Sequence, residues 1–252
     1  MTTATLKIPA QRAPELVGQT VVVIGGSAGI GLETARQART EGADIILTAR
    51  NPQRLKEAAC DLGAVSSAAF DASDPNSLAG FFGSLSEPID HVMVGGAGPR
   101  YGRPLEMDSD EVRRAFSERA ALVIEVARNV VGKVRPGGSM VLIGGTGGRR
   151  ITPGYEIVSA ITAALPALTA SLALDLAPIR VNLVAAGFVD TPLSATLLGD
   201  GLEARRAELR AKLPIGRVVA PADVAALAVH LMVNTAVTGA TYDIDGGQQF
   251  VA

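Results

Sequence analysis

The chain has 252 residues, enough to bury a substantial core in one domain and few for two. Hydrophobic residues make up 48% and charged residues 19% of the sequence, which argues against a disordered chain or a coiled coil. The net charge of −2 and the aromatic share of 4% argue against nucleic acid and anionic membrane as partners. We therefore expect a single domain over residues 1–252.

The first 15 residues contain charged side chains and no long apolar run, so we expect a flexible extension without an export signal. The single cysteine, Cys60, excludes an internal disulfide framework and fits a reducing compartment such as the cytoplasm. The longest uncharged stretch covers residues 157–174 and holds several polar side chains and Pro166. We expect it to form a helix buried in the protein interior or in a subunit interface, not a membrane span.

Short apolar runs alternate along the chain with segments of helical periodicity. In chain order the sequence predicts a strand at 20–24, a helix at 29–40, a strand at 45–48, a helix at 52–62, a strand at 68–70, a helix that begins at Pro75 after the cap Asp74, a strand at 91–94, a helix at 109–134, a strand at 140–143, a helix at 157–176, a strand at 179–184, a helix that begins at Pro221, and a strand at 240–244. This alternation predicts an α/β fold, a Rossmann-type doubly wound parallel sheet with helices on both faces. In such a sheet, ligands bind at the carboxyl ends of the strands.

A glycine-rich run, Gly25-Gly26-Ser27-Ala28-Gly29-Ile30-Gly31, follows the first predicted strand and leads into a predicted helix. Glycines let the backbone approach a pyrophosphate closely, and the start of a helix offers free N–H groups to it. The run therefore predicts a nucleotide site. The residues expected to form it are Gly25, Ser27, Ala28, Gly29, Ile30 and Gly31.

The second predicted strand ends in Thr48-Ala49-Arg50-Asn51. A site selective for an unphosphorylated ribose carries an acid near this point to accept from the 2′-hydroxyl group, and this sequence has none there. The guanidinium of Arg50 instead matches a 2′-phosphate. We expect NADP(H) to be preferred over NAD(H), with Arg50 and Asn51 at the adenosine end of the cofactor.

The glycine run resembles the TGxxxGxG motif of the short-chain dehydrogenase/reductase family, with Ile24 in place of the threonine. The resemblance covers about residues 16–250. The other motifs that carry it are Asp71-Ala72, the run 94–98 at the place of the family's NNAG, the run 179–182 with Gly187-Phe188-Val189-Asp190-Thr191-Pro192, and the run 243–247. By this resemblance, the cofactor site also includes Asp71 and Ala72 at the adenine, Gly95, Gly96 and Ala97 in its wall, and Val189 and Thr191 near the nicotinamide.

The chain departs from the family at the positions that carry its chemistry: an asparagine, a serine, and a tyrosine and lysine four residues apart on one helix. The LTASLA run at 168–173 resembles a family motif and sets the register. It places Val158 at the tyrosine position and Thr162 at the lysine position. Gly144 or Gly145 stands at the serine position, and the asparagine position falls within one residue of Glu118.

Tyr155, three residues before Val158, is the candidate for proton delivery; the alternative is an aromatic side chain that packs at the mouth of the cleft. The residue four positions after it is Ser159, which has no charge to lower a tyrosine pKa from about 10. Glu118 is a second candidate, with a solvated helix glutamate as the alternative.

Two arginine pairs near the predicted strand ends are candidates for holding an anionic substrate, with solvent-facing turns as the alternative. They are Arg149 with Arg150 and Arg100 with Arg103. We expect His91 and His230 to be structural. The spacing of histidine, cysteine and carboxylate residues predicts no metal site.

The sequence favours an NADP(H)-dependent oxidoreductase that acts on a small-molecule carbonyl or alcohol with atypical proton delivery. The alternatives are a non-catalytic NADP(H)-binding sensor or partner subunit and, with less support, a different reaction on the same fold. The apolar helix and the apolar C-terminus predict a homo-oligomer, a tetramer or a dimer.

Overall fold

The computed structural model describes residues 15–96, 98–99, 101–149 and 151–251. Its centre is a seven-stranded sheet in the order β3-β2-β1-β4-β5-β6-β7, and neighbouring strands are parallel. The strands are β1 (Thr20–Ile24), β2 (Asp44–Ala49), β3 (Ser66–Ala69), β4 (Ile89–Val94), β5 (Val134–Gly145), β6 (Arg180–Ala186) and β7 (Thr241–Ile244). The predicted doubly wound α/β fold is confirmed. The N-terminal extension expected at 1–15 lies outside the described residues except for Glu15.

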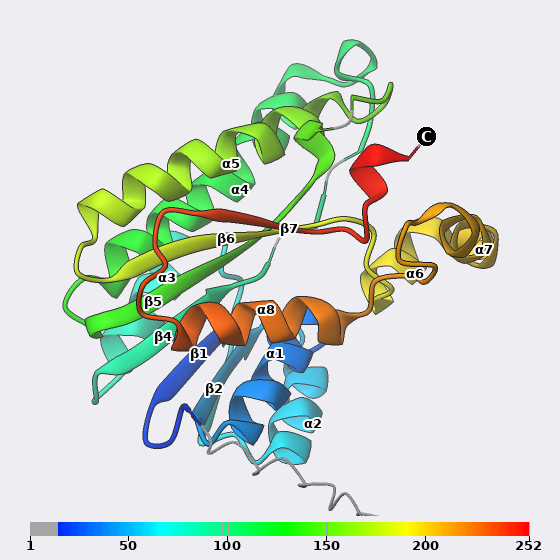
Figure 1. Cartoon of the computed structure of the whole chain (residues 1–252). Helices are drawn as coiled ribbons and strands as arrows, with labels where there is room; N and C mark the ends of the chain where they lie inside the picture. Colours follow the sequence, from blue (N-terminus) through cyan, green and yellow to red (C-terminus); the bar gives the residue numbers. More distant parts are fainter. Residues whose placement is uncertain (1–14, 97, 100, 150, 252) are drawn as a thin grey trace, which may run out of the picture.

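Helices cover both faces of this sheet (Figure 1). They are α1 (Gly29–Thr40), α2 (Pro52–Leu62), α3 (Pro75–Ser84), α4 (Ser109–Val130), α5 (Glu156–Asp175), α6 (Pro192–Leu198), α7 (Leu202–Lys212) and α8 (Pro221–Val233). Short 3-10 turns lie at Pro104–Glu106, Gly147–Arg149, Gly199–Gly201 and Gln248–Phe250.

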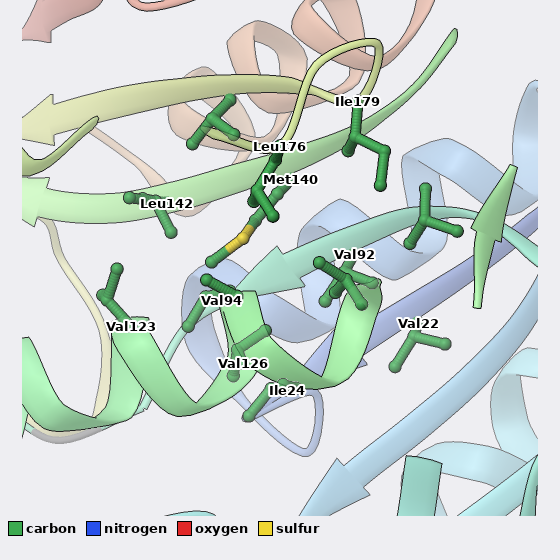
Figure 2. Close-up of a cluster of buried hydrophobic side chains, with 14 of the residues drawn as sticks. Val22, Ile24, Val92, Val94, Val123, Val126, Met140, Leu142, Leu176 and Ile179 are labelled. Atoms are coloured by element: carbon green, nitrogen blue, oxygen red, sulfur yellow. The ribbon is translucent and has the colours of Figure 1, made fainter. Parts of the chain in front are cut away.

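The two faces follow from the alternation of side chains along each strand. Val22 and Ile24 of β1 belong to the cluster that packs against α3, α4 and α5. Figure 2 shows this cluster, in which β1 and β4 side chains lie beside those of Val123 and Val126 from α4. Val21 and Val23 belong to the opposite cluster, which packs against α1, α2 and α8. Both faces are thus buried, which explains the continuous apolar runs in the sequence.

The predicted bounds of α1 and α2 agree with the structure because glycine and capping signals mark them. Asn51 caps α2 by accepting from the Arg54 amide at 2.9 Å, and the Asp74 side chain caps α3. Strand β5 begins at Val134, earlier than predicted, because Val134 pairs with Ile89 before a register shift that the apolar run does not reveal.

Among the described residues, α5 is the one helix whose length and composition would allow it to cross a membrane. Its buried side chains, among them Ile157, Leu165 and Ala173, face the protein, and the helix packs against β6. The sequence predicts a helix buried in the protein interior or in a subunit interface, and the structure buries one face of it against its own domain.

Candidate cofactor site

The strand order reverses between β1 and β4, which places a ligand crevice at the carboxyl ends of these strands. The glycine runs that follow them touch there. The amide of Gly95 donates to the Ile24 carbonyl at 3.0 Å, and a Cβ on Gly25 would lie 3.1 Å from the Gly96 nitrogen. Gly25 also has a φ of +83°, so a side chain is excluded by both space and conformation.

The glycine loop leads directly into α1. Ala28 occupies the N-cap of this helix and makes no side-chain capping bond, so the first amides keep free N–H groups. A Cβ on Gly31 would lie 2.3 Å from the Gly25 carbonyl oxygen, which shows how tightly the loop folds over the helix start. The structure therefore brings together the predicted loop residues in a cradle that fits a pyrophosphate.

The end of β2 adds positive charge to this cradle. Arg50 follows the strand, and Arg54 in the first turn of α2 donates from Nε to the Ser27 Oγ at 3.3 Å. The sequence analysis missed Arg54; its place four residues after Arg50 at a helix start was the available signal. Two guanidinium groups and a hydroxyl group at one strand end are a donor set suited to a phosphate monoester.

Asp71 and Ala72, which the resemblance places at the adenine, lie in the loop that follows β3. The Asp71 Oδ1 accepts from the Ser73 amide at 3.0 Å and from its hydroxyl at 2.8 Å. These hydrogen bonds, together with the nearby Arg50 cation, lower the pKa of the Asp71 carboxyl group. Ala72 packs against the core cluster on the α3 side.

The loop that follows β6 packs against the start of α1. Val189 is buried, and Thr191 caps α6 with a reciprocal bond to Ser194. A Cβ on Gly29 would lie 3.4 Å from the Thr191 Cγ2, so this loop packs against the start of α1. An ion pair of 2.6 Å between Asp190 and Arg206 fastens the loop to α7. Ala97, expected in the same wall, lies outside the described residues.

The positions of the family's serine, tyrosine and lysine lie close together. A Cβ on Gly145 would face Thr162 at 3.3 Å, whereas one on Gly144 would face the core residue Leu183 at 2.9 Å. Gly145 is therefore the serine position. Val158 and Thr162 both approach Gly147, and the Thr162 Oγ1 donates to the Val158 carbonyl at 2.7 Å. These positions hold no group that titrates near neutral pH.

Tyr155 is the N-cap residue of α5, and 42% of it is exposed. Its ring packs against Tyr101, with 4.8 Å between centroids, and a bond from the Gly102 amide to the Gly154 carbonyl joins the two loops. Partial burial raises the pKa of Tyr101. The contact with Tyr101 does not decide between the two interpretations of Tyr155, so its role in proton delivery stays a prediction.

Two of the arginines considered for substrate binding, Arg149 and Arg103, form ion pairs within the protein. Arg149 forms an ion pair with Asp243, with Nη2 2.6 Å from Oδ1, and binding of an anionic substrate by this group stays a prediction. Arg103 pairs with Glu106 at 3.2 Å. Arg100 and Arg150 lie outside the described residues.

The histidines have structural partners, as predicted. His91 is buried between the Ser139 Oγ at 2.8 Å and the Gln19 Oε1 at 2.7 Å. The His230 Nε2 lies 3.2 Å from the Asn234 Nδ2. Within the described part of the chain, no group of three or more histidine, cysteine or carboxylate residues is arranged to hold a metal ion.

An arginine that was not singled out in the sequence lies at the expected place of the family's asparagine on α4. Arg119, one residue after Glu118, reaches the carboxyl ends of β4 and β5, where Nη1 donates to the Gly95 carbonyl at 2.8 Å. The one-residue uncertainty in the register hid this side chain. The crevice thus contains a cation that the family motif does not predict.

The chain matches the family described as enoyl-(acyl carrier protein) reductase over residues 25–249. The short-chain dehydrogenase/reductase ATR9 of Stachybotrys chlorohalonatus is 30% identical over 265 residues, which covers 93% of this chain and 98% of that protein. The MalC reductase/Diels-Alderase from Malbranchea aurantiaca has a similar structure, with a TM-score of 0.87 at 26% identity over 95% of this chain and 100% of that one. BdcA in complex with NADPH gives a TM-score of 0.81 at 28% identity over 92% and 95% of the two chains.

Proposed function

Since the chain belongs to the short-chain dehydrogenase/reductase family, we propose that it is an NADP(H)-dependent oxidoreductase acting on a small-molecule carbonyl or alcohol. The observation that carries the cofactor assignment is the pair of cations at the end of β2, where Arg54 contacts Ser27 of the glycine loop and Arg50 lies nearby in sequence. BdcA, a structural neighbour, binds NADPH.

The residues present fit this cofactor. The glycine cradle and the uncapped start of α1 would hold its pyrophosphate, and Arg50 and Arg54 would hold its 2′-phosphate. Val189 and Thr191 would border its nicotinamide half. When bound, NADPH supplies the hydride, so the protein has to orient the cofactor and the substrate and control the proton.

Proton delivery is the part of the proposal in which the chain departs from its family. Gly145 and Val158 carry no hydroxyl group, the Thr162 hydroxyl group donates to the Val158 carbonyl, and none of the three is a titrating acid. Tyr155 or water would supply the proton, and the loss of a positioned acid costs roughly 10²–10⁴ in rate. We therefore propose slow reduction of simple ketones.

Because no titrating acid stands at the family's serine, tyrosine and lysine positions, a second candidate function is a non-catalytic NADP(H)-binding sensor or partner subunit. Two measurements, made in sequence, test the cofactor site and then separate the two candidate functions. Calorimetric titration with NADPH tests the cofactor site that both share. NADPH oxidation across a panel of aldehydes and ketones then separates them, because turnover supports the enzyme and tight binding without turnover supports the sensor.

We also propose that the protein is cytoplasmic and assembles into a homo-oligomer through the outer face of α4 and α5. An apolar hollow of about 170 Å³ lies between these helices, and Phe116, which is 43% exposed, lines it. The hollow is otherwise lined by Ala120, Ala160, Ile161, Ala164, Leu165 and Leu168. A second copy of the same chain would cover this face.

A further inference from the structure

Arg119 projects from α4 to the carboxyl ends of two adjacent central strands. Its Nη1 donates to the Gly95 carbonyl at 2.8 Å, after β4. Its Nη2 donates to the Val94 carbonyl at 3.2 Å and to the Ile143 carbonyl of β5. One guanidinium group thus connects β4 with β5 at the edge of the sheet where the cofactor crevice lies.

Two glycines, Gly95 and Gly96, lie beside this side chain, and neither has room for a Cβ. Gly96 has a φ of +118°, and a Cβ there would lie 2.8 Å from the Leu122 Cδ2 and 3.7 Å from the Arg119 Nη1. A Cβ on Gly95 would lie 2.6 Å from the Ile24 carbonyl oxygen. The family resemblance places asparagines at these two positions, whereas here close contacts with Ile24 and Leu122 exclude a side chain at either one.

The charge of Arg119 is retained and is not compensated locally. Burial lowers the pKa of Arg119 to about 10, which leaves the group protonated at neutral pH. Its hydrogen-bond partners are neutral carbonyl oxygens. No ion pair joins Arg119 to a carboxylate of the described residues, whereas most other arginines of this part of the chain have one.

We propose that Arg119 is the positioning cation of the nicotinamide half of the site, and that its fixed charge makes the protein bind NADPH more tightly than NADP⁺. The proposal rests on the proposed function. The oxidised nicotinamide ring carries a positive charge that the reduced ring lacks, so a nearby fixed cation raises the free energy of the oxidised complex alone. Thr162, at the lysine position on α5, supplies no charge, and Arg119 supplies one from the neighbouring helix α4.

Arg119 also ties β4 to β5, so a purely structural role has to be separated from the electrostatic one. Arg119→Lys keeps the charge and loses the planar fork of donors. Arg119→Gln keeps two N–H donors and loses the charge. The ratio of the dissociation constants for NADP⁺ and NADPH reports on the charge, because loss of the strand connection alone would weaken both complexes together.

The experiment is calorimetric titration of the full chain with NADPH and with NADP⁺ for the unmodified protein and both variants. Arg128→Gln is the matched control, since Arg128 lies on the same helix, 68% exposed and paired with Glu125. We expect NADPH to bind at least about tenfold more tightly than NADP⁺, because a fixed charge within about 12 Å gives that ratio or more at an effective dielectric constant of about 20. Arg119→Gln removes most of this ratio, whereas Arg119→Lys and Arg128→Gln keep it.

A ratio at or below one in the unmodified protein overturns the proposal, and this outcome does not depend on whether any variant folds. The proposal is also overturned if Arg119→Gln leaves the ratio unchanged, or if both Arg119 variants change it equally. In either case Arg119 would serve only to connect β4 with β5. If the unmodified protein bound neither form, the cofactor assignment itself would be wrong. The two failures are therefore distinguishable.

Discussion

The Nε of Arg54 lies 3.3 Å from the Oγ of Ser27, and this hydrogen bond joins the first turn of α2 to the glycine loop. Ser27 is 6% exposed, so the loop atom is fixed in the fold while the guanidinium group remains at the surface. The contact positions Arg54 beside the loop that holds phosphate in this fold class. It also makes Arg54 as important to the cofactor assignment as Arg50.

The first prediction concerns these two cations. Arg50→Gln and Arg54→Gln should each weaken NADPH binding by about tenfold or more, since a hydrogen bond to a charged group contributes roughly 1.5–3 kcal/mol. NADH binding should change little in either variant. Arg36→Gln, an exposed arginine on α1, is the control. Equal losses for NADPH and NADH would mean that the two arginines support the loop and do not contact a 2′-phosphate.

The second prediction reverses the cofactor preference. Ala49→Asp combined with Arg50→Gln places a carboxylate at the end of β2, where it can accept from a ribose 2′-hydroxyl group and repels a phosphate. NADH should then bind more tightly than NADPH. Calorimetric titration measures both, and an unchanged preference would locate the specificity elsewhere.

The third prediction restores the family's reacting groups. Gly145→Ser, Val158→Tyr and Thr162→Lys together should produce ketone reduction that the unmodified protein lacks or performs slowly. The backbone allows the serine, because a Cβ at Gly145 meets only the Thr162 Cγ2 within 3.4 Å, and that atom is removed in the same variant. NADPH oxidation with a simple ketone is the readout. A folded, cofactor-binding variant without any gain would show that the helix no longer holds the reacting geometry.

Tyr155 provides the fourth prediction. If the unmodified protein reduces a carbonyl substrate, Tyr155→Phe should lower turnover by roughly 10²–10⁴ and leave NADPH affinity nearly unchanged. Tyr101→Phe is the matched control, because the Tyr101 ring packs against that of Tyr155 and has the same hydroxyl group. An equal turnover before and after the Tyr155 substitution would assign the proton to water or to Glu118.

His91 gives the fifth prediction, a pH dependence of stability. Burial lowers the pKa of His91 to about 4, below its ordinary value of 6.5, and the neutral ring accepts from Ser139 and donates to Gln19. The unfolded chain therefore binds the proton first as the pH falls. The stabilisation is complete above pH 6.5 and is lost between 6.5 and about 4, by at most about 1.4 kcal/mol per pH unit.

Urea unfolding at several pH values measures this dependence. His91→Gln removes the titrating group, so its free energy of unfolding should vary less with pH over the same window. A steeper decline in the unmodified protein than in the variant is the expected result. Parallel curves would mean that other groups cause the acid sensitivity.

The seven strands and the glycine loop after β1 were predictable from the sequence because β-branched runs and glycine runs mark them at short range. Helices α6 and α7 were not predicted. The segment 202–212 is rich in charged residues and buries only Leu209, so it has little apolar periodicity. Arg54 and Arg119 were missed because their roles depend on contacts with Ser27 and with the ends of β4 and β5. Such contacts appear only when distant segments are folded together.

The central claim is that the crevice at the ends of β1 and β4 binds NADP(H), and calorimetric titration of the unmodified protein with NADPH and NADH tests it most directly. The account predicts one NADPH per chain, bound at least about tenfold more tightly than NADH, because Arg50 and Arg54 contact the 2′-phosphate. Equal affinity for the two cofactors, or binding of neither, would contradict it.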